Sequence, residues 1–269
     1  DDARNKRLDF PPLPQVAVEL GRLASSSDPD LGEATRLVER DNQLAGRVVQ
    51  VASSAAMGGR AVTDLQGAVV RLGVNGLRDL AFAITMGRVF RCPPLDDLVK
   101  QQMQHSFVVA IGTARACKML GLSDKYGFLC GLFHDIGHLA VLIALARYGR
   151  DDPEMLKPEF ASTVADQLHG SMGPWVLKSW GMHNMVVDVA AHHHESGSAG
   201  AAMPMCQAVA AVDAADGVEL EVDTAQARAA ALCQLPVGYE AGLSGDQLVD
   251  LAEVVHIARN DDVVARMMG

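Results

Sequence analysis

The apolar residues of this chain recur at helical intervals along nearly its whole length. In residues 13–24, for example, Val16, Leu20 and Leu23 fall on one helical face. No stretch alternates apolar and polar residues as a half-buried strand does, and no Asn-Gly turn joins two β-rich runs. The pattern therefore predicts an all-α protein. Comparable helical spacing appears in residues 43–55, 101–120, 123–149, 162–181, 203–216 and 244–269.

Prolines and glycines divide this helical pattern into segments. The dipeptide Pro93–Pro94 interrupts it, and a stretch rich in Gly, Ser and Ala at 195–204 is a second break. Thr63 followed by Gln66 has the form of a capping box, with Gly73 as the end of that helix. We therefore expect a helical lobe before the prolines and a longer helical region after them.

One apolar stretch after the prolines carries groups that can bind a metal or move a proton. Residues 131–141 read GLFHDIGHLAV, in which His134 and Asp135 are adjacent and His138 follows one helical turn later. A single histidine on an apolar face is most often a hydrogen-bonded core residue. The same stretch also resembles the H-E-x-x-H helix of zinc metalloproteases, with Asp135 in place of the glutamate.

The histidines of the chain are clustered rather than evenly spread. Of 9 histidines, eight lie within residues 105–194, where even spacing would place about three. Two carboxylates, Asp213 and Asp216, follow on one face of a later helix. Imidazole and carboxylate groups are the ligands of zinc, iron and manganese in hydrolytic sites. Because buried polar groups need partners, we expect these side chains to converge, and a metal would satisfy all of them.

Composition and charge narrow the classes of function. The chain has 269 residues, 49% hydrophobic and 21% charged, as expected for a globular protein with a sizeable core. Its net charge of −10 disfavours non-specific nucleic-acid binding, which needs a basic surface. The 5 scattered cysteines form no Cys-x-x-Cys pair and are typical of reduced thiols in a cytoplasmic protein. No apolar run reaches the roughly 18 residues of a membrane span, so we expect no membrane segment.

Several segments together resemble the HDOD domain family, a branch of the HD superfamily of metal-dependent phosphohydrolases. The dyad in HDIGH resembles the His-Asp pair of that superfamily, and this short motif alone has low specificity. The ordered set extends over about 250 residues and is much more specific. The segments of this ordered set are FPPLPQVAVEL, the run from Val38 to Ala83, FLCGLFHDIGHLAVLIAL with the dyad, HGSMGPWVLKSWGMHNMVVDVAAHHHE and AGLSGDQLVDLAEVV.

The resemblance implies a multi-helix bundle of the HDOD or HD-domain type with an N-terminal helical lobe. We assign residues 8–95 to that lobe, 96–216 to an HD-like core with the metal site, and 217–269 to C-terminal helices of the same unit. HDOD domains commonly accompany sensor, receiver or cyclic-dinucleotide domains in bacterial signalling, and many have lost catalysis. The resemblance therefore implies a cytoplasmic signalling module that binds a protein partner or a nucleotide second messenger.

The related HD-GYP proteins are metal-dependent phosphodiesterases that cleave cyclic di-GMP, and their ligand set has counterparts here. The resemblance implies that these residues hold one or two divalent ions of iron, manganese or zinc. Asp135 would serve both ions through its two oxygens, and we regard Asp135 and His138 as the catalytic candidates. In chain order the metal-ligand counterparts are His105, His134, Asp135, His169, His193, His194 and Asp213.

Three departures from the HD-GYP pattern leave the function open among alternatives. His138 stands where those proteins have a lysine, Gln101 stands where a glutamate is expected, and no Gly-Tyr-Pro motif follows the histidine pair. We favour a signalling module, with or without a bound metal, that lacks efficient catalysis. The alternatives are a metal-dependent phosphohydrolase or phosphodiesterase, and a structural remnant whose polar cluster only organises the core.

Overall fold

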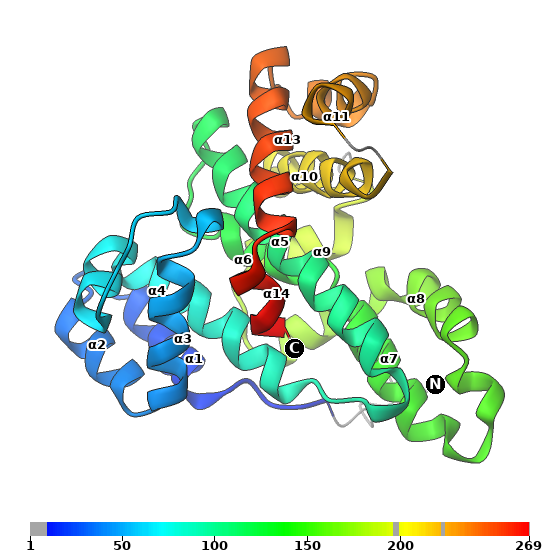
Figure 1. The fold of residues 1–269 in the computed structure, drawn as a ribbon. Coiled ribbons are helices and arrows are strands. Elements are labelled where there is room, and N and C mark those ends of the chain that lie inside the picture. Colours follow the sequence, from blue (N-terminus) through cyan, green and yellow to red (C-terminus); the bar gives the residue numbers. More distant parts are fainter. Residues whose placement is uncertain (1–9, 196–198, 222–223, 269) are drawn as a thin grey trace. The chain divides into compact units, whose positions relative to one another are not determined.

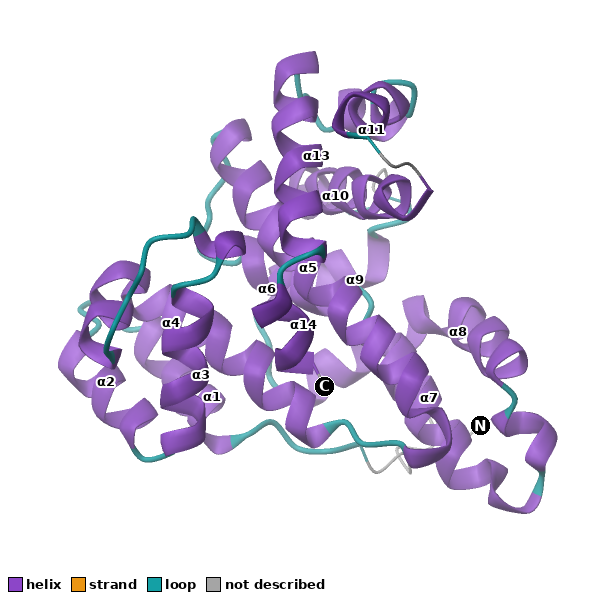
Figure 2. Ribbon diagram, viewed as in Figure 1, coloured by secondary structure: helices purple, strands orange, loops and turns teal. Residues whose placement is uncertain are grey.

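The computed structural model describes residues 10–195, 199–221 and 224–268. Throughout these ranges the regular structure is helical, and no strand occurs in them (Figure 2). The predicted all-α class is confirmed. The chain divides into two compact units, which we call the N-terminal lobe (Pro11–Phe90 and the residues from Asn260 onward) and the His-rich unit (Phe10 and Arg91–Arg259).

The N-terminal lobe is a small helical bundle whose longest helix lies against the others. Helix α4 packs on α1, α2 and α3, and the last helix of the chain, α14, packs on α3 and α4 (Figure 1). The apolar residues at helical spacing, such as Leu20, Val48 and Leu77, are fully buried in its core. The helices are α1 (Gln15–Ala24), α2 (Leu31–Glu39), α3 (Asn42–Ala52), η1 (Ala55–Met57), α4 (Leu65–Val89) and α14 (Asp262–Met268).

The start of α4 differs from the predicted capping box. Asp64, not Thr63, is the N-cap, because its side chain accepts a hydrogen bond of 2.7 Å from the backbone N–H of Gly67. Gly73 ends the first helical segment of α4 as predicted, because its φ of 64° and ψ of 179° are not helical. A second helical segment follows and extends to Val89.

The His-rich unit is built around two helix pairs, α5 with α6 and α7 with α8 (Figure 1). Helix α10 packs on α5, and α13 packs on both. Its longer helices are α5 (Asp96–Leu120), α6 (Gly127–Phe133), α7 (Ile136–Tyr148), α8 (Pro158–Ser179), α9 (Asn184–His192), α10 (Met203–Glu221), α11 (Ala225–Leu232), α12 (Pro236–Glu240) and α13 (Gly245–Arg259). Short 3₁₀ turns occur at Pro93–Leu95, Gly149–Asp151, Pro153–Leu156 and Gly200–Ala202.

Two glycines beside the His-Asp dyad allow neighbouring helices to approach closely. A Cβ atom on Gly137 would lie 2.0 Å from the backbone oxygen of His169, and one on Gly131 would lie 2.6 Å from that of Val109. Neither position has room for a side chain, because the atoms they face are backbone. The glycines therefore let α8 and α5 pack directly against the dyad segment.

The segment that carries the dyad is apolar enough to resemble a membrane helix. Gly127–Asp151 is long and apolar enough to span a membrane by length and composition alone, a property that the search for uninterrupted apolar runs does not find. However, 78% of its apolar window is buried inside the protein. This burial is typical of the central helix of a folded core.

Candidate metal centre

The dyad lies at a break between two helices. His134 is the C-cap of α6 and Asp135 is the N-cap of α7, with φ −107° and ψ 18° at Asp135. The sequence pattern predicts one continuous helix here, and the break turns both side chains toward the same interior space. It also argues against the metalloprotease alternative, which needs both histidines of H-x-x-x-H on one regular helix.

One group of potential ligands gathers on the side of Asp135 that faces α5 and α10. His105 Nε2 lies 3.3 Å from His134 Nε2 and 3.4 Å from Asp213 Oδ1. Asp135 Oδ2 lies 3.5 Å from His134 Nε2 and 3.8 Å from His105 Nε2. The ligand atoms of His105, His134 and Asp213 all lie within 4.8 Å of one another, which is close enough for one ion.

A second group gathers around the other oxygen of Asp135. Oδ1 lies 3.2 Å from His193 Nε2 and 3.6 Å from His169 Nε2, and His169 Nε2 lies 3.0 Å from His194 Nε2. These four residues also have ligand atoms within 4.8 Å of one another. Asp135 therefore stands between two sets of ligands and presents one oxygen to each.

Backbone carbonyls fix the orientation of three of the imidazoles. The Nδ1 atoms of His134, His169 and His193 lie 2.8, 2.8 and 3.3 Å from the carbonyl oxygens of Gly131, Asp166 and Val189. A carbonyl oxygen only accepts, so each Nδ1 carries the proton and each Nε2 keeps a lone pair. This is the arrangement in which histidine binds a metal through Nε2.

His105 is held in the same way by a carboxylate. Its Nδ1 lies 2.8 Å from Oδ2 of Asp216, a side chain that is only 1% exposed. Arg259 donates to both oxygens of Asp216, through Nε at 2.9 Å and through a terminal guanidinium nitrogen. The chain Arg259–Asp216–His105 therefore fixes the tautomer of His105 and neutralises a buried carboxylate.

The polar atoms at the centre are poorly paired by hydrogen bonds with one another and are suited to bind a metal. Asp135 Oδ1 and His193 Nε2 are buried and have no hydrogen-bond partner, although they lie 3.2 Å apart. With the proton of His193 on Nδ1, both atoms are acceptors and cannot bond to each other. The Nε2 atoms of His105 and His134 face each other with two lone pairs, an unfavourable contact unless a cation lies between them. Divalent ions would satisfy all of these atoms.

Electrostatics keep four of the ligands in the protonation states that metals require. At His105, burial by itself would lower the pKa, but the neighbouring carboxylates, Asp216 foremost, outweigh it and raise the pKa. Burial lowers the pKa of His134 from 6.5 to about 4, and burial also lowers the pKa values of His169 and His194. Burial by itself would raise the pKa of Asp135, but His134, His138 and His193 more than offset this, and the pKa lies well below its usual range. Neutral imidazoles and an ionised carboxylate are therefore available at neutral pH.

His138 lies beside the ligands but belongs to neither group. Its Nε2 is 3.1 Å from Asp166 Oδ1, its Nδ1 is 3.4 Å from Asp135 Oδ2, and its ring stacks on His169 with centroids 4.2 Å apart. His105, His138, Asp166 and Arg259 all line a pocket of about 470 Å³. Of the two ligand groups, only His105 is part of this lining, so the pocket reaches the centre at His105.

The structure brings together all seven predicted metal ligands and leaves three other histidines outside. His183 caps α9 at the surface, and His192 and His256 belong to neither ligand group. Sequence reasoning noted Asp216 but gave it no role, and it missed Arg259 entirely. The regular spacing of Asp213 and Asp216 on one face was the available signal for Asp216. No pattern marks an arginine more than forty residues further on as part of the site.

Comparison with known sequences identifies a family over most of the chain. The model of the HDOD domain family matches residues 10–196, a range that includes six of the seven ligands and ends before Asp213. An uncharacterized protein from Treponema pallidum (strain Nichols) is 27% identical over 204 residues, which cover 69% of this chain and 38% of that protein. The chain thus spans well under half the length of this curated relative.

Solved structures share the fold over nearly the whole chain. A candidate metal-dependent phosphohydrolase from Shewanella amazonensis SB2B is 23% identical with a TM-score of 0.66, covering 96% of this chain and 95% of that one. A candidate signal transduction protein from Marinobacter aquaeolei VT8 is 21% identical with a TM-score of 0.64, covering 98% of this chain and 61% of that one. At these identities the similarity shows the fold alone.

Proposed function

Because the chain belongs to the HDOD domain family, we propose that it is a signalling module whose metal centre binds and hydrolyses a phosphate ester. The observation that carries this proposal is the position of Asp135, which presents one oxygen to each of two ligand groups. The sequence favoured a module without efficient catalysis. The complete pair of ligand groups and the adjoining pocket favour the phosphohydrolase alternative.

The divalent metals, when bound, would supply an activated water and polarise a phosphoryl oxygen. His105, His134 and Asp213 would hold one ion, and His169, His193 and His194 the other, with Asp135 shared. Iron, manganese and zinc all accept this set of nitrogen and oxygen ligands. The set is richer in histidine than the oxygen sites that magnesium and calcium prefer.

The remaining residues of the pocket would orient the ester and handle its proton. His138 lines the pocket next to Asp135, so its Nε2 is placed to donate a proton to a leaving-group oxygen. Gln102 donates a hydrogen bond of 3.3 Å to Asp135 Oδ2 and restrains that carboxylate. Gln101 and Ser162 add neutral polar groups to the pocket, suited to the uncharged part of an ester.

A signalling module that binds its ligand without turnover is the second candidate. Asp166 and Asp135 both lie close to His138, and these two carboxylates compete with a leaving group for its protons. The partner in that case would be a signalling protein or a nucleotide second messenger. The 4 buried cysteines suit the reducing cytoplasm in which such a module would act.

Hydrolysis of bis(p-nitrophenyl) phosphate by the metal-free chain, reloaded separately with Fe²⁺, Mn²⁺ or Zn²⁺, tests the proposal. We expect turnover that depends on the added ion and is lost in His134→Ala/Asp135→Ala. Asp188→Asn, which removes an exposed carboxylate of α9 in the same unit, is the matched control and should retain the rate. Stoichiometric metal without turnover would favour the second candidate, and absence of both metal and turnover would leave only the structural remnant.

A further inference from the structure

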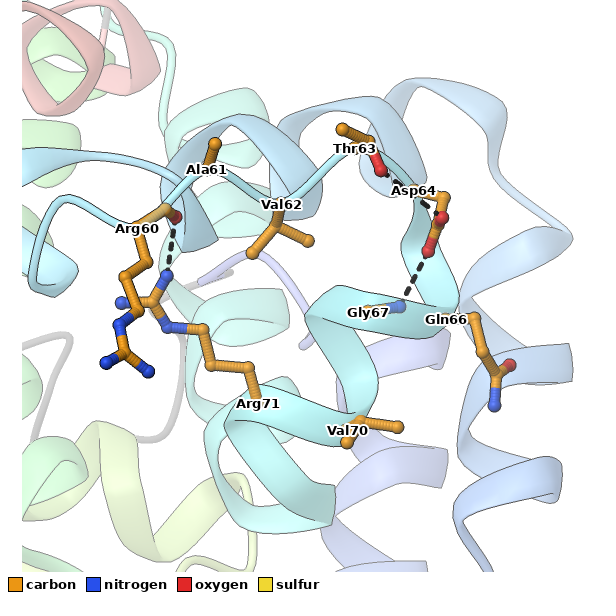
Figure 3. A pocket seen from close by; sticks show the side chains of 9 residues that line it. All are labelled: Arg60, Ala61, Val62, Thr63, Asp64, Gln66, Gly67, Val70 and Arg71. Atoms are coloured by element: carbon orange, nitrogen blue, oxygen red, sulfur yellow. Dashed lines mark hydrogen bonds between the residues drawn. The ribbon is translucent and has the colours of Figure 1, made fainter.

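A second pocket lies in the N-terminal lobe, and no residue of the metal centre lines it. Its volume is about 580 Å³, and it is formed by the loop that follows η1 together with the first turns of α4. Figure 3 shows the guanidinium groups of Arg60 and Arg71 at one end, and Thr63, Asp64 and Gln66 at the other. We call this site the arginine pocket.

Hydrogen bonds hold the loop of the arginine pocket in one conformation. Gly58 and Gly59 have φ values of 94° and 66°, which glycine adopts without strain. The Ser53 hydroxyl donates to the Val62 carbonyl at 2.9 Å and accepts from the Val62 N–H at 3.0 Å. Arg71 donates to the Arg60 carbonyl at 2.7 Å. The wall of the pocket is therefore formed before any ligand binds, which lowers the entropic cost of binding.

The two arginines of the pocket carry charge that no described carboxylate neutralises. Arg71 donates only to the backbone carbonyls of Arg60 and Met57, and Arg60 is exposed with no ion pair to any described residue. Four other arginines of the lobe do pair with a carboxylate within 4 Å. Examples are Arg40 with Glu19 at 3.2 Å and Arg88 with Asp41 at 2.7 Å. The arginine end of the pocket is thus a local positive site on a chain of net charge −10. The carboxylate of Asp64 lies at the other end of the pocket and caps α4.

Beside the arginines the pocket is apolar and open to solvent. The side chain of Val70 is on the exposed side of α4, with 69% of the residue accessible. Val62 belongs to the loop, and its side chain points from the loop toward α4 (Figure 3). A small inorganic anion would use only the guanidinium groups and would leave Val70 in water. A ligand that matches the whole pocket combines a carboxylate with a neighbouring apolar group.

We propose that the arginine pocket binds an acidic segment of a partner protein. An Asp or Glu side chain of the segment pairs with Arg60 and with the free face of the Arg71 guanidinium, and an adjacent apolar side chain covers Val62 and Val70. A peptide segment provides both groups at the spacing of neighbouring residues. This site goes beyond the proposed hydrolytic function, because it would connect the module to its partner whether or not the metal centre turns over.

Selection of a phage-displayed library of random twelve-residue peptides on the full chain tests this proposal. We expect enriched peptides in which Asp or Glu adjoins an apolar residue. Synthetic copies should bind the wild type, and Arg60→Gln and Val70→Asn should each weaken them by about tenfold, the effect of one charge-assisted or well-packed contact. Arg22→Gln removes an exposed arginine elsewhere in the lobe and should leave binding unchanged.

Circular dichroism of each variant establishes that the lobe remains folded, and Arg71 is left intact because it anchors the loop. The proposal is overturned if no acidic sequences are enriched, or if the enriched peptides bind Arg60→Gln as tightly as the wild type. It is also overturned if inorganic phosphate binds with a dependence on Arg60 while the acidic peptides do not bind, since a small anion would then be the ligand. None of these results involves turnover, so the proposed hydrolytic function stands or falls separately.

Discussion

At the scale of single residues, the metal centre depends on how each imidazole is held as much as on which imidazoles are present. The histidines and Asp135 could be found from the sequence because their types and order are distinctive. Helical spacing alone does not separate Asp213 from Asp216, since both lie on one face, and it was the family resemblance that selected Asp213. The structure adds that Asp216 contacts Nδ1 of His105, on the far side of that ring from the centre. Arg259 is identified only by its contact with Asp216.

The role of Asp216 predicts a loss of metal affinity when its charge is removed. Asp216→Asn keeps the size of the side chain but weakens the hydrogen bond that fixes the proton of His105 on Nδ1. We expect an affinity for Mn²⁺ or Zn²⁺ about 10–100-fold lower, measured by isothermal titration calorimetry against a competing chelator. Asp188→Asn should retain the affinity of the wild type. An unchanged affinity in a folded Asp216→Asn chain would show that Asp216 has no such role.

Replacing His138 should lower the rate of turnover without lowering the metal content of the chain. Because it belongs to neither ligand group, His138→Gln should keep the metal content of the wild type while lowering kcat by about 100-fold, the usual contribution of a general acid. Plasma mass spectrometry and steady-state kinetics on the same preparation check this. Loss of metal in His138→Gln would instead make His138 a ligand, and an unchanged kcat would remove it from the reaction.

At the scale of helices, periodicity identified the elements but not the features that build the site. The sequence predicts one helix through the dyad, whereas the chain breaks between α6 and α7 at His134 and Asp135. Periodicity cannot show this break, because the apolar spacing continues across it. The need for Gly131 and Gly137 is also invisible in the sequence, because it comes from the backbones of other helices that lie against them.

The close contact of α7 with α8 predicts that Gly137 is essential for stability. A Cβ in Gly137→Ala would lie 2.0 Å from the backbone oxygen of His169, so the helices must separate. We expect the free energy of unfolding to fall by about 1–3 kcal/mol in urea titrations, the usual cost of overpacking. Gly170→Ala on α8 is the control, because nothing lies within 4 Å of its added Cβ. That change should be neutral or stabilise the chain slightly. Equal stability of the two variants would contradict this packing.

At the scale of the whole molecule, the fold class followed from the helical pattern, and the family followed from the ordered set of motifs. The boundaries assigned at residues 95 and 216 remain a prediction. The family model ends at residue 196, yet Asp213, Asp216 and Arg259 complete the centre beyond it. Residues far apart in the chain therefore meet in the His-rich unit, and only the tertiary structure reveals which of them do.

The most direct test of the account is the metal content of the purified chain, measured by plasma mass spectrometry beside His134→Ala/Asp135→Ala. Circular dichroism establishes that the variant is folded, and Asp188→Asn serves as the unaffected control. The account predicts about one or two ions of iron, manganese or zinc per wild-type chain, and a near-complete loss in the double variant. A wild type that stays metal-free after these ions are offered at neutral pH would contradict it.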